Sequence, residues 1–148
     1  MDQEKETIGR MIANYFDSRP DFSNRFFSPA EADEISVAEE VLKVILPEDY
    51  KRFLSYSNGF EGFINGYYLR LIPVGYLYEN TQDYCSETRP WAIYLGTNGG
   101  GEMVVLDSRS TPMQFGLLPY LGQEEDFIAL GDSFQSFIAS VYNDEIFE

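Results

Sequence analysis

Leu46-Pro47-Glu48-Asp49-Tyr50-Lys51-Arg52-Phe53-Leu54-Ser55-Tyr56-Ser57-Asn58-Gly59 is the stretch that decides the fold, because it holds the start and stop signals of a short helix. Pro47 suits the first helical position, where the N–H that proline lacks would have no partner in any case. Glu48 and Asp49 place negative charge at the positive end of the helix dipole. A helix is therefore predicted to start at Pro47.

One face of this predicted helix is apolar. Tyr50, Phe53 and Leu54 are spaced by three and four residues, so their side chains share a face that must be buried. Asn58-Gly59 follows, and glycine permits the left-handed backbone that ends a helix. Upstream of Gly59 the sequence predicts helix, whereas downstream it predicts mostly strands and turns.

Two helices are predicted before this stretch. An amphipathic helix from about Thr7 to Asp17 and a loop at 23–27 form an extension over residues 1–27. A second helix is expected to start at Ser28, with Pro29 in its first turn and Glu31 completing a capping box. Its apolar stripe leads directly into Pro47 and consists of Ile35, Ala38, Leu42 and Ile45.

Downstream, the apolar pattern changes to that of strands. Asn65-Gly66 suits a type I′ turn, so the flanking segments 60–64 and 67–72 are predicted to pair as a hairpin. Segment 73–84 has no clean alternation and is predicted to be a loop with at most one helical turn. Further strands are expected at 91–95, 102–107 and 115–118. Apolar residues between Phe127 and Val141 have helical spacing around Asp132 and Ser133, either of which could cap a last helix.

Charge and composition limit the possible functions. The 148 residues carry a formal net charge of −15, which argues against direct nucleic-acid binding and favours a basic partner, although such charge also simply keeps a protein in solution. The single cysteine excludes an internal disulfide. No signal peptide or membrane-spanning apolar run is visible, so we expect one cytoplasmic domain over residues 1–148.

The residues favour binding over catalysis. The chain has no histidine, so the usual general base near neutral pH and most zinc sites are missing. Gly99-Gly100-Gly101-Glu102 lacks the Lys and Ser/Thr of a phosphate-binding loop and is predicted to be a hairpin turn. The acidic run 124–126 lacks the spacing of a calcium-binding loop. We expect no enzyme activity, no metal and no cofactor; paired carboxylates of a sugar-acting enzyme are the less favoured alternative.

Several motifs, in order, resemble the SMI1/KNR4 family of the SUKH superfamily. The stretch 46–54 followed by Asn58-Gly59 is similar to the family's Leu-Pro, acidic, tyrosine, Phe-Leu and Asn-Gly positions. Segment 96–107 resembles its glycine-rich hairpin, and the positions that resemble its closing helix are Ala129, Leu130, Ser133, Phe134, Phe137 and Ile138. The likeness spans about Ser28 to Val141, so residues 28–148 are interpreted as the family-like core.

The resemblance implies an α+β fold in which helices pack against a curved, mostly antiparallel or mixed sheet. It also implies a binding protein, because many bacterial members are immunity proteins that neutralise polymorphic or contact-dependent toxins, often nucleases. The alternative is a regulatory or scaffold domain with an endogenous protein partner. The first hypothesis predicts a basic toxin domain as partner, contacted by aromatic anchors and carboxylates at Tyr76, Tyr78, Asp83, Tyr84, Glu124, Glu125 and Asp126.

Overall fold

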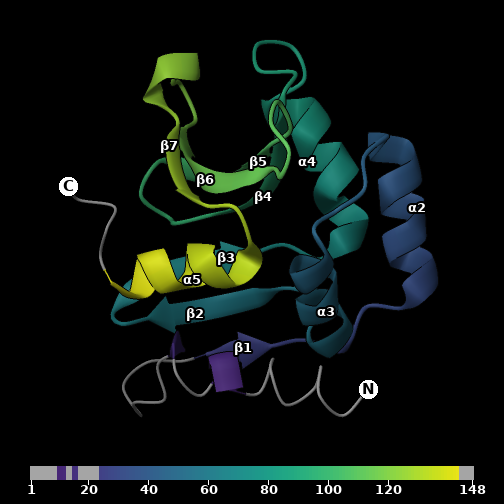
Figure 1. Ribbon diagram of the computed structural model, residues 1–148, viewed down its shortest axis with the longest axis vertical. Helices are drawn as coiled ribbons and strands as arrows, with labels where there is room; N and C mark the ends of the chain where they lie inside the picture. Colours follow the sequence, from purple (N-terminus) through teal and green to yellow (C-terminus); the bar gives the residue numbers. More distant parts are fainter. Residues whose placement is uncertain (1–9, 13–14, 17–23, 144–148) are drawn as a thin grey trace.

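The protein has an α+β fold built on a seven-stranded sheet (Figure 1). It is seen in a computed structural model that describes residues 10–12, 15–16 and 24–143. The predicted fold class is confirmed, and every strand pairing among these residues is antiparallel. Strand order in the sheet follows the chain: β1 (Arg25–Phe26), β2 (Phe60–Ile64), β3 (Tyr67–Leu71), β4 (Ala92–Thr97), β5 (Glu102–Asp107), β6 (Gln114–Pro119) and β7 (Ile128–Gly131).

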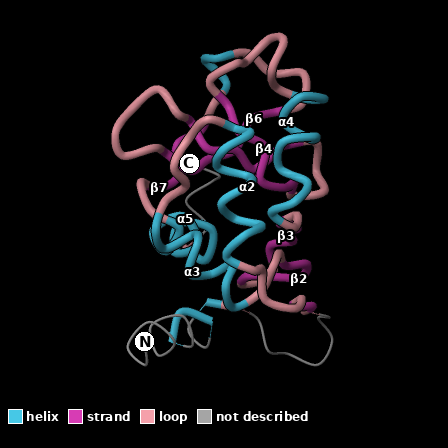
Figure 2. Tube along the Cα trace, turned by 90° about the vertical axis from the view of Figure 1, so that its right-hand side faces the viewer, coloured by secondary structure: helices cyan, strands magenta, loops and turns pink. Residues whose placement is uncertain are grey.

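The helices pack around the sheet and do not form one separate layer. Figure 1 shows α5 lying across the β2–β3 half, with α3 beside it, while α2 runs next to α4 on the other side of the molecule; Figure 2 shows α2 from the front. The elements are α2 (Ala32–Leu42), α3 (Glu48–Tyr56), η1 (Val74–Tyr76), α4 (Leu77–Tyr84), η2 (Glu124–Asp126) and α5 (Phe134–Tyr142).

The predicted helix after Pro47 is confirmed as α3, and its apolar face lies in the core. Tyr50, Phe53 and Leu54 are all buried. The ring of Phe53 lies 4.7 Å from that of Phe134 in α5, measured between centroids. Aromatic contacts between α3 and α5 therefore form the centre of the fold.

Asp49, expected to act at the start of α3, binds the start of another helix. Its two carboxylate oxygens accept hydrogen bonds from the backbone N–H groups of Phe134 and Gln135, each at 3.0 Å. These amides belong to the first turn of α5, where they lack partners within the helix. Asp49 thus accepts hydrogen bonds from the N–H groups at the start of α5, in addition to carrying charge at the start of α3.

The second predicted helix begins later than expected. Glu31, not Ser28, is the N-cap of α2, and the Glu34 side chain accepts the Glu31 N–H at 2.9 Å. The preceding residues are instead held against the end of α3, where Ala30 N–H donates to the Leu54 carbonyl at 2.8 Å. The helix also stops at Lys43, which has a left-handed φ of 60°, so Ile45 leaves the predicted buried stripe and is 69% exposed.

The turn signals in the sequence predict their flanking strands correctly, whereas three other elements are not predicted. The hairpin of β2 and β3 is confirmed, with positive φ at Asn65 and Gly66. Segment 23–27 contains β1, and segment 73–84 contains η1 and α4. The predicted last helix is confirmed as α5, which Ser133 caps, but Leu130 of its apolar pattern lies in the strand β7 before it. The predicted helix from Thr7 to Asp17 falls mostly outside the described residues.

The sheet is nearly interrupted between β3 and β4. These strands share only the pairs Arg70–Thr97 and Leu71–Gly96. Where β4 lacks a neighbouring strand, α4 covers it, and the Thr81 hydroxyl accepts the Tyr94 N–H at 2.9 Å. At the junction a Cβ on Gly96 would collide with the Arg70 carbonyl oxygen, so glycine is needed there.

Candidate protein-binding surface

A groove lined by tyrosines lies on the sheet face opposite the α3–α5 core. Along β3, Leu69 and Leu71 are buried, whereas Arg70 is exposed, because successive side chains point to opposite faces. The hollow measures about 650 Å³. We call it the tyrosine groove; its main lining residues are Arg25, Glu61, Arg70, Tyr76, Tyr84, Tyr94 and Tyr120.

The tyrosine rings of this groove support one another. Tyr84 and Tyr94 stack with centroids 5.3 Å apart, and Tyr120 meets Tyr84 edge-on at the same distance. The hydroxyls of Tyr94 and Tyr120 are hydrogen-bonded at 2.9 Å. Burial, together with this hydrogen bond, raises the pKa of the Tyr94 phenol, so its proton is retained at neutral pH. The groove therefore presents a rigid, uncharged aromatic wall.

A buried arginine holds this wall in place. The guanidinium of Arg89 donates to the backbone carbonyls of Tyr84 (2.7 Å), Gly122 (2.7 Å) and Tyr120 (3.0 Å). It thereby ties the end of α4 to the turn after β6 and fixes the backbone of two groove tyrosines. Bonds from a charged donor are stronger than those between neutral groups. No spacing or motif around Arg89 indicated this role in the sequence.

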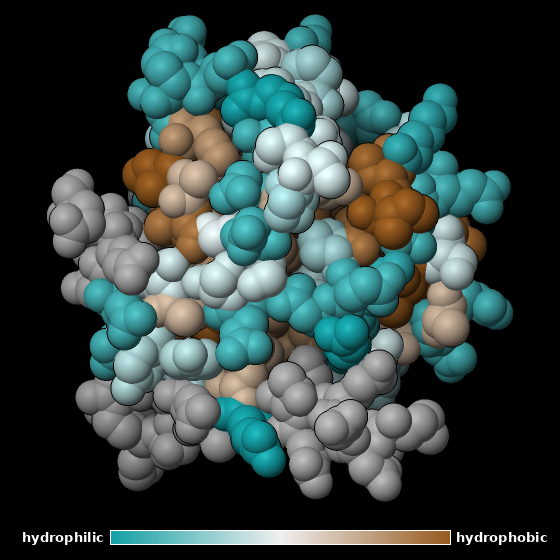
Figure 3. All heavy atoms as spheres, in the orientation of Figure 1, coloured by the Kyte–Doolittle hydropathy of each residue, from teal (hydrophilic) through white to brown (hydrophobic). Residues whose placement is uncertain are grey.

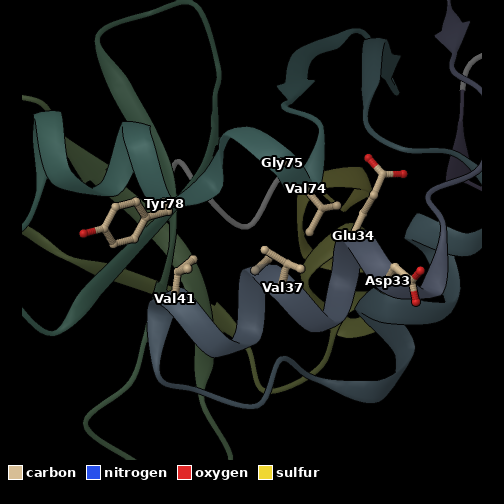
Figure 4. Close-up of a pocket in the computed structure, with 8 residues that line it drawn as sticks. Asp33, Glu34, Val37, Val41, Val74, Gly75 and Tyr78 are labelled. Carbon is tan, nitrogen blue, oxygen red and sulfur yellow. The ribbon is translucent and has the colours of Figure 1, made fainter.

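A second hollow lies between α2, η1 and α4 and is mostly apolar (Figure 4). It measures about 310 Å³, and we call it the helix groove. Tyr78 lies beside Val41 at one end, and Asp33 and Glu34 lie at the other. Its lining residues are Asp33, Glu34, Val37, Ala38, Val41, Val74, Gly75 and Tyr78. Figure 3 shows apolar side chains gathered on this side of the molecule among hydrophilic ones.

Comparison with known proteins now identifies the family. Residues 29–140 match the SMI1/KNR4 family (SUKH-1). The chain belongs to this family. None of the curated protein sequences compared with it gives a significant match. The SMI1/KNR4 family includes immunity proteins, and the family-like residues Tyr50, Phe53 and Leu54 are buried in this member, so they build the fold rather than either groove.

The predicted contact residues of this SMI1/KNR4 chain lie in separate places. Tyr76 and Tyr84 line the tyrosine groove, with 56% and 44% of their surface exposed. Tyr78 lines the helix groove, and Asp83 is exposed on α4. Tyr94 and Tyr120, which sequence reasoning did not select, complete the wall beside Tyr84. Only the packing of α4 on β4 brings them together.

The three predicted carboxylates lie in η2, where neighbouring groups already engage two of them. Glu124 pairs with Arg109 at 2.7 Å, and the side chain of Asp126 accepts the Gln123 N–H at 2.8 Å. Arg109 also stacks over Trp91 at 3.9 Å from the ring centroid. Glu125 is exposed and makes no such contact with the residues that the structure describes, so it is the carboxylate of the three most available to a partner.

Arg109 also binds Asp107 side-on: its Nε donates to Oδ1 at 2.9 Å and its Nη2 donates to Oδ2 at 2.8 Å. Burial alone would raise the pKa of the Asp107 carboxyl, but the hydrogen bonds from Arg109 outweigh it and keep this pKa below its usual value. Asp107 is therefore ionised at neutral pH, and the pair anchors the turn after β5. This arrangement is structural, because the Asp107 side chain is almost fully covered.

The single cysteine of the SMI1/KNR4 chain is held in its protonated form. Cys85 is buried, and burial raises the pKa of its thiol to about 11, so the reactive thiolate is scarce at neutral pH. Within residues 10–12, 15–16 and 24–143, no group of three or more Cys, Asp or Glu side chains is arranged to hold a metal ion. In the same residues no helix is long and apolar enough to cross a bilayer.

Proposed function

We propose that this protein is a non-catalytic immunity protein that neutralises a toxin by binding it. The observation that carries the proposal is the match of residues 29–140 to a family that includes immunity proteins. The net charge of −15 supports a basic toxin domain, for example a nuclease whose active face grips phosphate. An acidic protein that covers such a face blocks access to the substrate without any catalysis.

The contact surface that we propose comprises Tyr76, Tyr78, Asp83, Tyr84, Glu124, Glu125 and Asp126. Exposed tyrosines support it, because large aromatic side chains supply contact area at a small entropic cost and are enriched at interfaces. The rigid wall behind Tyr84 supports an anchoring role, since a side chain that is already held loses little freedom on binding. The carboxylates would mainly speed association.

Co-expression with the toxin domain encoded beside the gene tests the proposal. We expect the wild-type chain to restore growth and to co-purify with the toxin. Replacing both Tyr76 and Tyr84 with Ala should weaken the complex by about tenfold or more, because two interface aromatics are lost. The exposed Tyr142 in α5 lies outside the proposed surface, so Tyr142→Ala serves as the matched control. Absence of both protection and complex formation would refute immunity.

A further inference from the structure

We propose that the helix groove is the docking site for a basic amphipathic helix of the partner. This inference rests on the proposed function, because it specifies which element of a basic toxin is recognised. It makes the groove between α2, η1 and α4 an interaction surface distinct from the tyrosine groove. Four properties of the described residues support it: an exposed apolar lining, acidic charged residues in that lining, absence of an open backbone edge, and an empty space over Gly75.

The apolar lining is exposed in the free protein. Val37 and Val41 are one helical turn apart on α2, and 59% and 43% of their surfaces are accessible. Tyr78, on α4 across the groove, is 43% exposed, and Val74 closes the floor. Side chains of this kind are usually buried, and a contiguous exposed set marks an interaction surface. The groove thus offers room for apolar side chains from outside.

The charged residues that line the groove are both acidic: Asp33 and Glu34. Helices α2 and α4, which form its walls, contain four further carboxylates and no Lys or Arg: Glu39, Glu40, Glu79 and Asp83. Glu39 is compensated by Lys51 at 3.1 Å. Asp33 and Glu34 give the groove a negative potential, which favours Lys and Arg flanking the apolar face of a partner and disfavours acidic segments.

The backbone around the groove indicates the form of the occupant. Both walls are helices, whose N–H and C=O groups bond within each helix, so an incoming strand would find no backbone partners there. The outer edges of the sheet belong to β1 and β7, and the part of β4 without a neighbouring strand is covered by α4, so none of these edges lines the groove. The bound segment must therefore form its backbone hydrogen bonds internally, as an α-helix does. It must also present apolar side chains from successive turns.

Gly75 provides a way to block the groove without disturbing the core. A Cβ built on Gly75 meets no atom within 4 Å, and its φ lies outside the left-handed range, so a larger residue fits the backbone. Because Gly75 lines the groove, the side chain in Gly75→Leu would occupy the space that the partner needs. A double substitution, Val37→Gln with Val41→Gln, instead removes apolar surface while keeping helix propensity and net charge.

The direct test uses a designed peptide of about 14 residues with a leucine face flanked by lysines, long enough to form a marginal helix. Its binding to the full chain is measured by fluorescence anisotropy at about 0.15 M salt. The control peptide has the same composition in scrambled order. We expect the amphipathic peptide to bind about tenfold more tightly than the scrambled one, and Gly75→Leu or the double Gln variant to remove this difference.

The matched protein control is Ile45→Gln, which removes a more exposed apolar residue outside the groove. It should bind the peptide within about twofold of wild type, a much smaller change than one decade of affinity. Circular dichroism and the urea midpoint establish that every variant is folded. Equal binding of both peptides, or binding unaffected by Gly75→Leu, would show only diffuse charge attraction and would overturn the docking site.

The same variants separate the two proposals in the presence of the toxin. If wild type and Gly75→Leu neutralise the toxin equally, the helix groove is not the docking site, although the immunity function stands. If no toxin is neutralised but the peptide still binds in a Gly75-dependent manner, the docking site stands and the immunity function fails. Loss of protection in Gly75→Leu, with the fold intact, supports both.

Discussion

At the scale of single residues, Tyr50 has an unusual environment for a polar side chain. Its ring packs between Phe115 and Phe134, with centroids at 6.1 and 5.7 Å. Its hydroxyl is buried and finds no hydrogen-bond partner among the residues that the structure describes. Burial accordingly raises the pKa of the phenol. The aromatic ring, not the hydroxyl, must therefore account for what Tyr50 contributes to stability.

This environment predicts that Tyr50→Phe leaves the free energy of unfolding unchanged or raises it by up to about 1 kcal/mol, because a buried hydroxyl without a partner is removed. Tyr50→Ala should instead lower it by about 3 to 5 kcal/mol through the cavity left in the core. Urea denaturation of both variants measures the difference. A loss of more than about 1 kcal/mol in Tyr50→Phe would mean that the hydroxyl has a stabilising partner.

At the scale of elements, α3 and α5 depend on each other through Asp49. We predict that Asp49→Ala lowers the free energy of unfolding by about 1 to 2 kcal/mol, because the N–H groups of Phe134 and Gln135 lose their acceptor. The neighbouring Glu48→Ala is the control, since Glu48 also carries charge at the start of α3 but its exposed side chain pairs with Lys51 at the surface. Similar losses in both variants would show that charge at the start of α3 matters more than capping of α5.

Some elements could be predicted from the sequence because their signals are local, whereas others depend on distant residues. The hairpin of β2 and β3 depends on Asn65-Gly66, a signal contained in the turn itself. In contrast, β1 has two residues, and it is a strand only because Arg25 pairs with Glu61, far along the chain. Helix α4 has Leu77 as its one fully buried apolar residue, so no periodic pattern marks it. β7 likewise needs its pairing with β6.

The candidate surfaces were predictable only in part, for the same reason. Exposed aromatics at Tyr76, Tyr78 and Tyr84 could be selected from their local density in the sequence. Their division between two grooves could not, because it depends on which side of α4 faces β4 and which faces α2. The apolar lining of the helix groove carries no signal of its own in the sequence, since Val37 and Val41 look like ordinary helix residues until α2 is placed.

At the scale of the whole molecule, the net charge of −15 should govern how fast a basic partner binds. Neutralising η2 with Glu124→Gln, Glu125→Gln and Asp126→Asn is predicted to slow association with the toxin at about 0.01 M salt. The effect should fade near 0.15 M, where the Debye length falls to about 8 Å. Stopped-flow association rates measure it, and the dissociation rate should change little.

An unchanged association rate at low salt would remove η2 from the steering surface. The pairing of Glu124 with Arg109 bears on the result, because removing that carboxylate also breaks an ion pair and leaves Arg109 with Asp107 as its acidic partner. The single variant Glu125→Gln avoids this complication and should give the smaller change in the same direction. Comparing the two variants separates the local effect of η2 from the field of the remaining acidic residues.

The late position of α5 in the chain has a consequence for biosynthesis. The strands join the sheet in the order in which they leave the ribosome, so the sheet can grow as the chain emerges. The aromatic face of α3 nevertheless stays incompletely covered until Phe134 has been synthesised, close to the end of the described chain. A nascent chain that stops before α5 would therefore expose part of its apolar core, which makes truncated products natural targets for chaperones and proteases.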